Sequence, residues 1–335
     1  ITIRGNSSLL GNNQPLFVVD GIPFNNGSNG TSNQLTGGGA YGSRIQDLDP
    51  NNIASITVLK GAAAAALYGS RAANGVILIT SKSGSSAASK KGMEVTYNTS
   101  YSIEKIANLP DYQNTYGTGT NFNYQQVNGS WGAPFVGTKP YATTTEIPHW
   151  YDGIIGFEDL WGTTVPYQAY PNNVEDFFET GSVFDNSISV SGGNEKATMS
   201  IVASNMKQKG LVPNSEFNRT NISIGGQTQL DNKLNVGGNI QYARSFQHSF
   251  QGGANNAVGN ASALARTLYL GRNWNTSGQP YQNPLTNGSV FMVGAGQADN
   301  PYWSVENAGT ESETDRYASN LNLTYDVFDW LNVSY

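Results

Sequence analysis

Residues 47–84, DLDPNNIASITVLKGAAAAALYGSRAANGVILITSKSG, decide how the rest of the chain is organised. The opening Asp-Pro-Asn-Asn predicts a turn, because proline presets φ and Asn side chains bond to neighbouring backbone. A short buried strand is predicted around Ile53, Ile56 and Val58, and a second strand over residues 75–80. The alanine-rich segment between them predicts one turn of helix. The stretch shows no nucleophile or metal-ligand motif, so we expect an architectural unit.

Together with PLFVVDGIP at residues 15–23, this stretch resembles the plug of the SusC/RagA-like TonB-dependent outer-membrane transporters. The matching positions are residues 15–23, 48–60, 62, 64, 68–69, 71–72 and 74–80. The chain departs from the family pattern at Gly61, where Asp is usual, and at Asn51 and Asn52, where an acid is common. The resemblance implies a small α+β plug inside a transmembrane antiparallel β-barrel of about 22 strands.

The composition narrows the class of protein. Only 13% of the 335 residues are charged, and there are 39 Gly and 18 Tyr. The absence of cysteine excludes a disulfide framework and a thiolate metal site. A net charge of −6 argues against a nucleic-acid partner, which requires clustered Lys and Arg. No apolar run is long enough for a membrane helix. Membrane-spanning β-strands give a much weaker signal per segment, so a membrane β-barrel is not excluded.

We expect a mostly β chain in three parts. Residues 1–84 form an N-terminally incomplete plug, residues 85–92 a Ser/Gly/Lys linker, and residues 93–335 the first strands and extracellular loops of a C-terminally incomplete barrel. The chain starts in strand-like sequence and stops in mid-alternation, which we interpret as an internal piece of a longer protein. About seven barrel strands are predicted, over or near residues 95–103, 184–191, 196–207, 217–230, 234–246, 316–327 and 331–335.

The connections between these strands alternate between short and long. Residues 192–195, 231–233 and 328–330 are short turns, whereas residues 106–183, 208–216 and 247–315 are longer. Short turns at one end and long loops at the other are typical of outer-membrane barrels, with the loops extracellular.

The two faces of the strands also differ. Between residues 220 and 242 one face is apolar and aromatic, whereas the opposite face carries neutral amides and hydroxyls such as Asn221, Asn239 and Gln241. A soluble sandwich usually carries Lys and Glu on its polar face. The neutral polar face suits a lumen packed around a polar plug. The aromatic residues of the other face also allow a second interpretation, cross-strand packing in a soluble sheet.

No catalytic residue, metal site or cofactor is expected. The histidines His149 and His248 lie in predicted loops, and a lone loop histidine is more often solvated than ligating. The Gly-rich run at residues 37–42 spells a dinucleotide fingerprint, but it follows a loop and opens no helix. Acidic clusters near Glu158, Glu175 and Glu311 are interpreted as solvated loop charge, so we predict that the protein is not an enzyme.

Substrate contacts are predicted in two places. In related transporters the segment after the Asp-Gly turn faces the substrate, which implies Asn25, Asn26 and Tyr41. The long loops are rich in aromatic residues, whose faces suit glycan rings or peptides. Loops of this length also need a core of their own, and we expect more of these aromatic residues to pack in that core than to contact a ligand. The tryptophans predicted as substrate contacts are Trp131, Trp150, Trp161, Trp274 and Trp303.

The plug carries the cations Arg4, Arg44, Lys60 and Arg71. Buried unpaired cations are costly, so we expect carboxylate partners on the plug or on the barrel wall. Reversible polar contacts of this kind suit a plug that must shift when it is pulled.

The resemblance implies TonB-dependent active import of a large nutrient, a glycan or an oligopeptide, across the outer membrane of a Gram-negative bacterium. Its implied partners are a SusD-like surface lipoprotein acting as a lid, the TonB–ExbB–ExbD complex and outer-membrane lipid, with a dimer of the SusC–SusD pair as one arrangement. Two alternatives stay open. One is a non-transporting outer-membrane scaffold or adhesin barrel. The other is a soluble extracellular carbohydrate-binding β-protein, which leaves the alternation of turns and loops unexplained.

Overall fold

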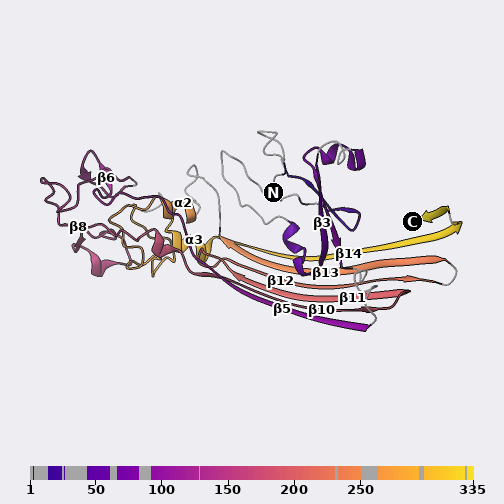
Figure 1. Ribbon diagram of the computed structural model, residues 1–335. Coiled ribbons are helices and arrows are strands. Elements are labelled where there is room, and N and C mark those ends of the chain that lie inside the picture. The colour runs from indigo at the N-terminus through magenta and orange to yellow at the C-terminus, as the bar shows by residue number, and fades with distance from the viewer. Residues whose placement is uncertain are drawn as a thin grey trace.

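The computed structural model describes residues 3, 14–24, 26, 44–60, 66–82, 92–127, 129–230, 233–250, 263–293, 298–328 and 330–335. A long antiparallel sheet, which we call the wall, dominates these residues, with a smaller sheet on one of its faces and a loop domain beyond one end of its strands (Figure 1). The smaller sheet and its short helices, in residues 14–82, are called the plug here.

The wall has seven strands in the order β15-β14-β13-β12-β11-β10-β5, all antiparallel. The strands are β5 (Gly92–Glu104), β10 (Gly181–Gly193), β11 (Ala197–Lys209), β12 (Glu216–Gln229), β13 (Leu234–Phe250), β14 (Gly309–Phe328) and β15 (Leu331–Ser334). Each of the seven strands predicted from the sequence is present. The predicted linker lies outside the described residues except for Gly92, which begins β5, so its extent stays a prediction.

The strand connections confirm the predicted alternation. Short connections, residues 194–196, 230–233 and 329–330, join β10 to β11, β12 to β13 and β14 to β15 at one end of the wall, the turn end. The other end, the loop end, carries the longer connections: residues 105–180, 210–215 and 251–308.

The two faces of the wall differ as the alternation predicts. The outer face exposes a broad set of large apolar side chains. They include Val95, Tyr97, Tyr101, Ile103, Phe184, Ile188, Met199, Ile222, Ile224, Ile240, Tyr317 and Leu321. An exposed apolar area of this extent marks a membrane or protein contact surface. The inner face presents buried polar side chains, among them Ser204, Asn221, Ser223 and Asn239, toward the plug.

The plug contains a four-stranded sheet in the order β2-β1-β4-β3. Its strands are β1 (Leu16–Val19), β2 (Ile22–Phe24), β3 (Ile53–Leu59) and β4 (Val76–Ser81), and its 3-10 turns are η1 (Arg44–Asp47), η2 (Pro50–Asn52) and η3 (Gly69–Ala72). The central pair, β1 and β4, runs parallel and buries Phe17, Val18 and Val76. The expectation of a buried β3 was wrong, since β3 is an edge strand with exposed Ile56 and Val58.

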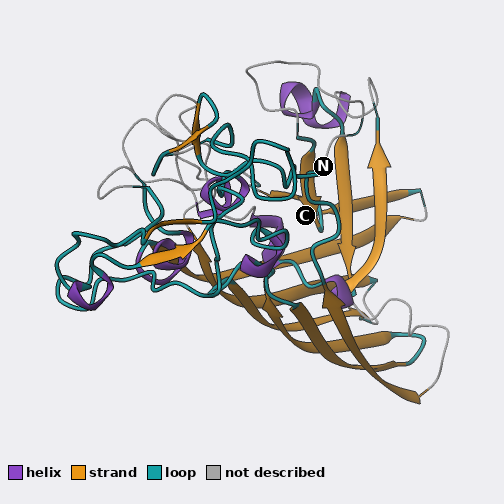
Figure 2. Cartoon of the chain, turned by 90° about the vertical axis from the view of Figure 1, so that its left-hand side faces the viewer, coloured by secondary structure: helices purple, strands orange, loops and turns teal. Residues whose placement is uncertain are grey.

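The loop domain is built from two distant parts of the chain, residues 105–180 and 263–308. It consists mainly of loops and turns with short helices and strands (Figure 2). Its elements are β6 (Gly119–Thr120), β7 (Asn123–Tyr124), β8 (Glu146–Pro148), η5 (Glu158–Leu160), β9 (Thr164–Pro166), η6 (Glu175–Phe177), α2 (Ala263–Leu268) and α3 (Pro301–Asn307). A shared aromatic core holds the two parts together, with the Trp150 and Trp274 ring centroids 5.0 Å apart. Among the described residues, no helix is both long and apolar enough to cross a bilayer.

Replacing a core tryptophan of the loop domain has a testable cost. Trp274 is 1% exposed, so Trp274→Ala removes a fully buried ring and leaves a cavity. We expect the opening free energy of the loop domain, measured by native-state hydrogen exchange, to fall by about 3–5 kcal/mol. The matched control is Trp131→Ala, because Trp131 is 67% exposed, and it should change that free energy by about 0.5 kcal/mol or less. Equal losses in the two variants would contradict this assignment of the core.

Candidate functional site: the plug–wall interface

The plug contacts the inner face of the wall through a first polar layer centred on Asp20. Its Oδ2 accepts hydrogen bonds from Ser81 Oγ at 2.7 Å and from Asn239 Nδ2 at 2.7 Å, with Gln241 Nε2 at 3.4 Å. Asn239 Nδ2 also donates to Ser81 Oγ, at 2.5 Å. One plug carboxylate therefore links β4 of the plug to β13 of the wall.

Local backbone chemistry places this carboxylate. Asp20 and Gly21 form the two-residue turn between β1 and β2, with φ of 49° and 85°. These left-handed values are typical of a type I′ hairpin turn, which favours Asp-Gly. The Ser81 backbone N–H donates to Asp20 Oδ1 at 2.8 Å and holds the side chain against the wall.

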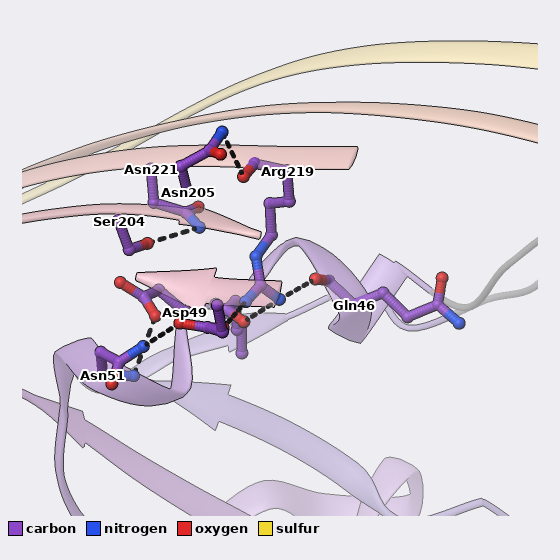
Figure 3. Close-up of polar contacts among 9 residues, drawn as sticks. Gln46, Asp49, Asn51, Ser204, Asn205, Arg219 and Asn221 are labelled. Atoms are coloured by element: carbon purple, nitrogen blue, oxygen red, sulfur yellow. Dashed lines mark hydrogen bonds and ion pairs between the residues drawn. The ribbon is translucent and has the colours of Figure 1, made fainter. Parts of the chain in front are cut away.

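A second polar layer, nearer the loop end, is centred on Arg219 of β12 (Figure 3). This guanidinium is 5% exposed. Its Nη1 donates to the backbone carbonyls of Gln46 at 2.6 Å and Leu48 at 2.9 Å, and its Nη2 lies 4.0 Å from Asp185 Oδ2. Hydrogen bonds to a charged group are among the stronger ones in proteins. The wall thus holds the η1 segment of the plug by its main chain.

Asp47 and Arg316 extend this second layer toward β14. Asp47 Oδ2 accepts from Arg316 Nη2 at 2.8 Å, and Asp47 Oδ1 accepts from Ser245 Oγ at 2.8 Å. The Arg316 guanidinium also lies 4.4 Å from the ring centroid of Phe24. The plug carboxylate and the wall cation are both largely buried, so separating them leaves a charge that must be hydrated.

The Asp-Pro-Asn-Asn turn that opens the key sequence stretch completes the second layer. Asp49 caps η2, since its Oδ1 accepts from the Asn51 backbone N–H at 2.8 Å, and Pro50 occupies the first position of the turn. This conformation presents Asn51, whose Nδ2 donates to Asp185 Oδ1 of the wall at 3.1 Å (Figure 3). The predicted turn therefore also serves as a contact with the wall.

The plug cations predicted as interface contacts are only partly described. Arg4 is outside the described residues, Arg44 is half-buried, and Lys60 and Arg71 are exposed. Among the described residues, an ion pair across the interface joins Arg316 of the wall to Asp47 of the plug, whereas Arg219 lies near Asp185 within the wall. Across the described interface, the plug supplies the carboxylates Asp20 and Asp47, and the wall supplies the guanidinium groups of Arg219 and Arg316. A role for the four plug cations stays a prediction.

The predicted substrate contacts separate into different environments. Trp150 and Trp274 were wrong choices, because both are 2% exposed or less and pack inside the loop domain. Trp131 and Trp161 are exposed and stay predictions. Trp303 is half-buried and donates from Nε1 to the Asn287 carbonyl at 2.8 Å.

The predicted apical residues of the plug are only partly described. Asn25 and Tyr41 lie outside the described residues. Asn26 donates from Nδ2 to Gln14 Oε1 at 2.8 Å and accepts from the Ile45 backbone N–H at 3.1 Å. These bonds join Asn26 to Gln14, before β1, and to Ile45 of η1, so Asn26 helps to position η1.

Sequence reasoning missed the residues that hold the plug. The sequence pattern places Asn239 and Gln241 on the inner face, but it predicts no function for Asp20, Asp47 or Arg219. The Asp-Gly pair after an apolar strand was the available signal, since it indicates a tight turn with an exposed carboxylate. Across the described residues, no group of three or more His, Cys, Asp or Glu side chains is arranged to hold a metal ion.

These features define a class of protein: a small plug domain held by polar contacts against the inner face of an antiparallel wall whose outer face is apolar. Residues 1–76 match the TonB-dependent Receptor Plug Domain family. The chain is 26% identical to TonB-dependent receptor SusC of Bacteroides thetaiotaomicron over 339 residues, which cover 97% of this chain and 29% of that protein. It is also 26% identical to TonB-dependent receptor P26 of Formosa agariphila, over 86% of this chain and 25% of that protein.

A solved structure, the RagAB peptide importer in its 'open-open' state, matches 96% of this chain and 33% of its own with a TM-score of 0.64 and 21% identity. The matches confirm the resemblance to SusC-like TonB-dependent receptors that the sequence motifs indicate, and the family model covers the plug part of the chain. It spans 25% and 29% of the length of the two curated relatives.

Removing the Arg219 guanidinium should loosen the plug. In Arg219→Met, the carbonyls of Gln46 and Leu48 lose their charged donor, and we expect the opening free energy of residues 44–52 to fall by about 1.5–3 kcal/mol. Hydrogen exchange of the detergent-solubilised full-length protein measures this loss. Arg244→Met is the control, because Arg244 pairs with Glu313 in an exposed contact on the wall, and it should leave exchange in residues 44–52 unchanged. No faster exchange in Arg219→Met would contradict the anchoring role.

His149 should make the loop domain sensitive to acid. Burial lowers the pKa of His149, against the opposing effect of Asp152 and Asp159, and neutral Nδ1 accepts from the Tyr151 N–H at 3.1 Å. Because the folded pKa lies below the unfolded value near 6.5, this stability is complete above pH 6.5 and is lost as pH falls through the folded pKa. Tryptophan-fluorescence melting at pH 7.5 and pH 5 should show a larger loss in the parent than in His149→Asn. Identical pH dependence in the two proteins would refute the assignment.

Proposed function

We propose that the protein imports a large hydrophilic nutrient across the outer membrane and is energised by TonB. The observation that carries the proposal is the polar plug–wall interface. Hydrogen bonds and ion pairs such as Asp47–Arg316 can be replaced by water when the plug moves. An apolar interface has no hydrogen-bonding groups that water could satisfy in this way, so separating a plug from it would cost more free energy. The interface therefore suits a plug that is displaced and returns.

The apolar outer face of the wall supports a location within the outer membrane. With the wall oriented as in known outer-membrane barrels, the turn end faces the periplasm and the loop domain projects outside. This orientation puts the aromatic loop domain where a substrate arrives and puts the plug between it and the periplasm. Import by this arrangement requires no chemical reaction on the substrate, and we propose that the protein is not an enzyme.

The partners are part of the same proposal. A SusD-like surface lipoprotein would cover the mouth as a lid, and TonB with ExbB and ExbD would supply the pulling force. Support comes from the likeness to SusC and to RagAB, which is a peptide importer with solved 'open-open' and 'closed-closed' states. Assembly of two such receptor–lipoprotein pairs stays a prediction.

The substrate class is a glycan or an oligopeptide. The exposed aromatic side chains of the loop domain, Trp131 among them, suit either the faces of sugar rings or peptide side chains. The amides and hydroxyls of the inner face, which lie beside Arg219, Arg316 and Asp185, suit both classes as well. The test therefore uses one probe from each substrate class.

Import should be measured in cells that produce the full-length protein, with a matched strain that lacks the gene. The probes are a fluorescently labelled tryptic digest of casein and a labelled hydrolysate of mixed glycans. We expect gene-dependent accumulation of one probe class, with at least a ten-fold loss when a protonophore removes the energy supply.

Two outcomes would change the conclusion. Gene-dependent binding of a probe at the cell surface without energy-dependent accumulation would favour a scaffold or adhesin. Recovery of the protein from the medium, with no heat-modifiable band in the membrane fraction, would favour the soluble carbohydrate-binding alternative.

A further inference from the structure

Four aromatic side chains form an exposed cluster on the loop domain, which we call the aromatic platform: Tyr116, Phe122, Trp131 and Tyr141. The Tyr116 ring centroid lies 5.7 Å from that of Phe122 and 6.3 Å from that of Trp131. The Tyr116 side chain is also hydrogen-bonded to that of Tyr141. Phe122, Trp131 and Tyr141 are each more than half exposed. The packing of the domain core therefore does not account for this cluster, which faces solvent.

The backbone at Phe122 is in an unfavourable conformation. Asn121 and Phe122 are the two turn residues of the β6–β7 hairpin, with φ of 52° and 64°. Positive φ at both positions is typical of a type I′ turn, in which glycine usually follows Asn. A bulky side chain in this left-handed conformation costs about 1–2 kcal/mol. A turn that only reversed the chain would not need a phenyl ring, and strain of this kind is concentrated at functional sites.

The backbone that carries the platform is closely packed. The Phe122 N–H donates to the Trp131 carbonyl at 2.9 Å and joins the two ring-bearing segments. Gly132 lies so close to Thr118 that an added Cβ would collide with the Thr118 carbonyl. The Thr118 N–H in turn donates to the buried Asn273 Oδ1 at 2.8 Å, which connects the platform to the core of the domain. The rings are thus held in place before a ligand arrives, which lowers the entropic cost of binding.

The chemistry of this segment favours a neutral glycan. Residues 112–138 contain no Asp, Glu, Lys, Arg or His, and exposed amides lie beside Phe122 at Asn121, Asn123 and Gln125. A sugar ring has a face of C–H groups that stacks on an aromatic ring and a rim of hydroxyls that bond to amides. Peptides are more often recognised through an open strand edge or through charged side chains. Uncharged rings bordered by amides therefore match sugars better than peptides.

We propose that the aromatic platform is a binding site for neutral glycans, with sugar rings stacked on Phe122 and Trp131. This inference rests on the proposed import function and names the substrate class as glycan. The β6–β7 hairpin lies in the part of the loop domain remote from the wall (Figure 1). In the proposed orientation the platform therefore captures a glycan outside the membrane, before the glycan reaches the plug.

The test removes a ring without weakening the turn that carries it. Phe122→Gly creates an Asn-Gly pair, which type I′ turns prefer, so we expect a melting temperature equal to or above that of the parent. Trp131→Ala removes the second ring. The matched control is Tyr269→Ala, because Tyr269 follows α2, lies outside the platform and is 67% exposed, as Trp131 is.

Binding is measured on the full-length protein in an amine-oxide detergent, which has no sugar headgroup to compete for the site. The probes are the labelled hydrolysate of mixed glycans and the labelled casein digest. Import of both probes is measured in cells that produce each variant. We expect the parent to bind the glycan probe, both platform variants to bind it at least ten-fold more weakly, and Tyr269→Ala to bind it as the parent does. Glycan import at low probe concentration should fall in the same two variants.

The contrary outcomes are distinct. Equal glycan binding by all four proteins, or a parent that binds the casein digest and no glycan, would overturn the platform and leave the import function standing. Platform variants that bind glycan normally but no longer co-purify with a lipoprotein from the same cells would assign the cluster to a protein interface and overturn the glycan site. A parent that binds glycan through the platform but imports neither probe would overturn the import function and leave the binding site standing.

Discussion

The rest of the structure depends on one constraint: a wall that is apolar outside and polar inside must have its inner hydrogen-bonding groups satisfied. Asn239, Asn221 and Ser245 are all buried, and a buried polar group without a partner is costly. The plug supplies partners through Asp20 and Asp47. Plug and wall therefore form one structural unit joined by polar contacts.

This kind of joint has a different energetic character from an apolar core. Burying apolar surface stabilises a contact in proportion to the buried area, and all of that free energy is lost when the surfaces separate. Hydrogen-bonded groups instead form hydrogen bonds with water once they separate. Among the described residues, the buried apolar clusters lie within the plug and in or beside the loop domain, where one also includes Val212 and Phe250 at the loop end of the wall, and the interface between plug and wall is mainly polar. Each body is thus internally rigid, while the joint between them is the part that can open.

Much of the fold could be predicted from the sequence, because the period of two is strong in the wall. Residues 220–242 alternate so regularly that the strands, their faces and the short turns followed directly. The site was harder. Asp20 and Asn239, or Gln46 and Arg219, lie far apart in the chain, and no local pattern relates them. Nor does local sequence distinguish a buried Trp150 from an exposed Trp131, since only the tertiary packing of the loops decides which ring is covered.

The loop domain has a consequence for how the molecule assembles. Its core joins residues 105–180 to residues 263–308, and Asn173 bonds to the carbonyls of Gly271 and Trp274. The strands β10 to β13 lie between these two segments in the chain. Contacts of such long sequence separation form slowly, because closing a long loop costs conformational entropy. Pairing of the four wall strands brings the two segments to the same end of the wall and lowers that cost, so we expect the loop core to form late in folding, on a wall whose strands are in register.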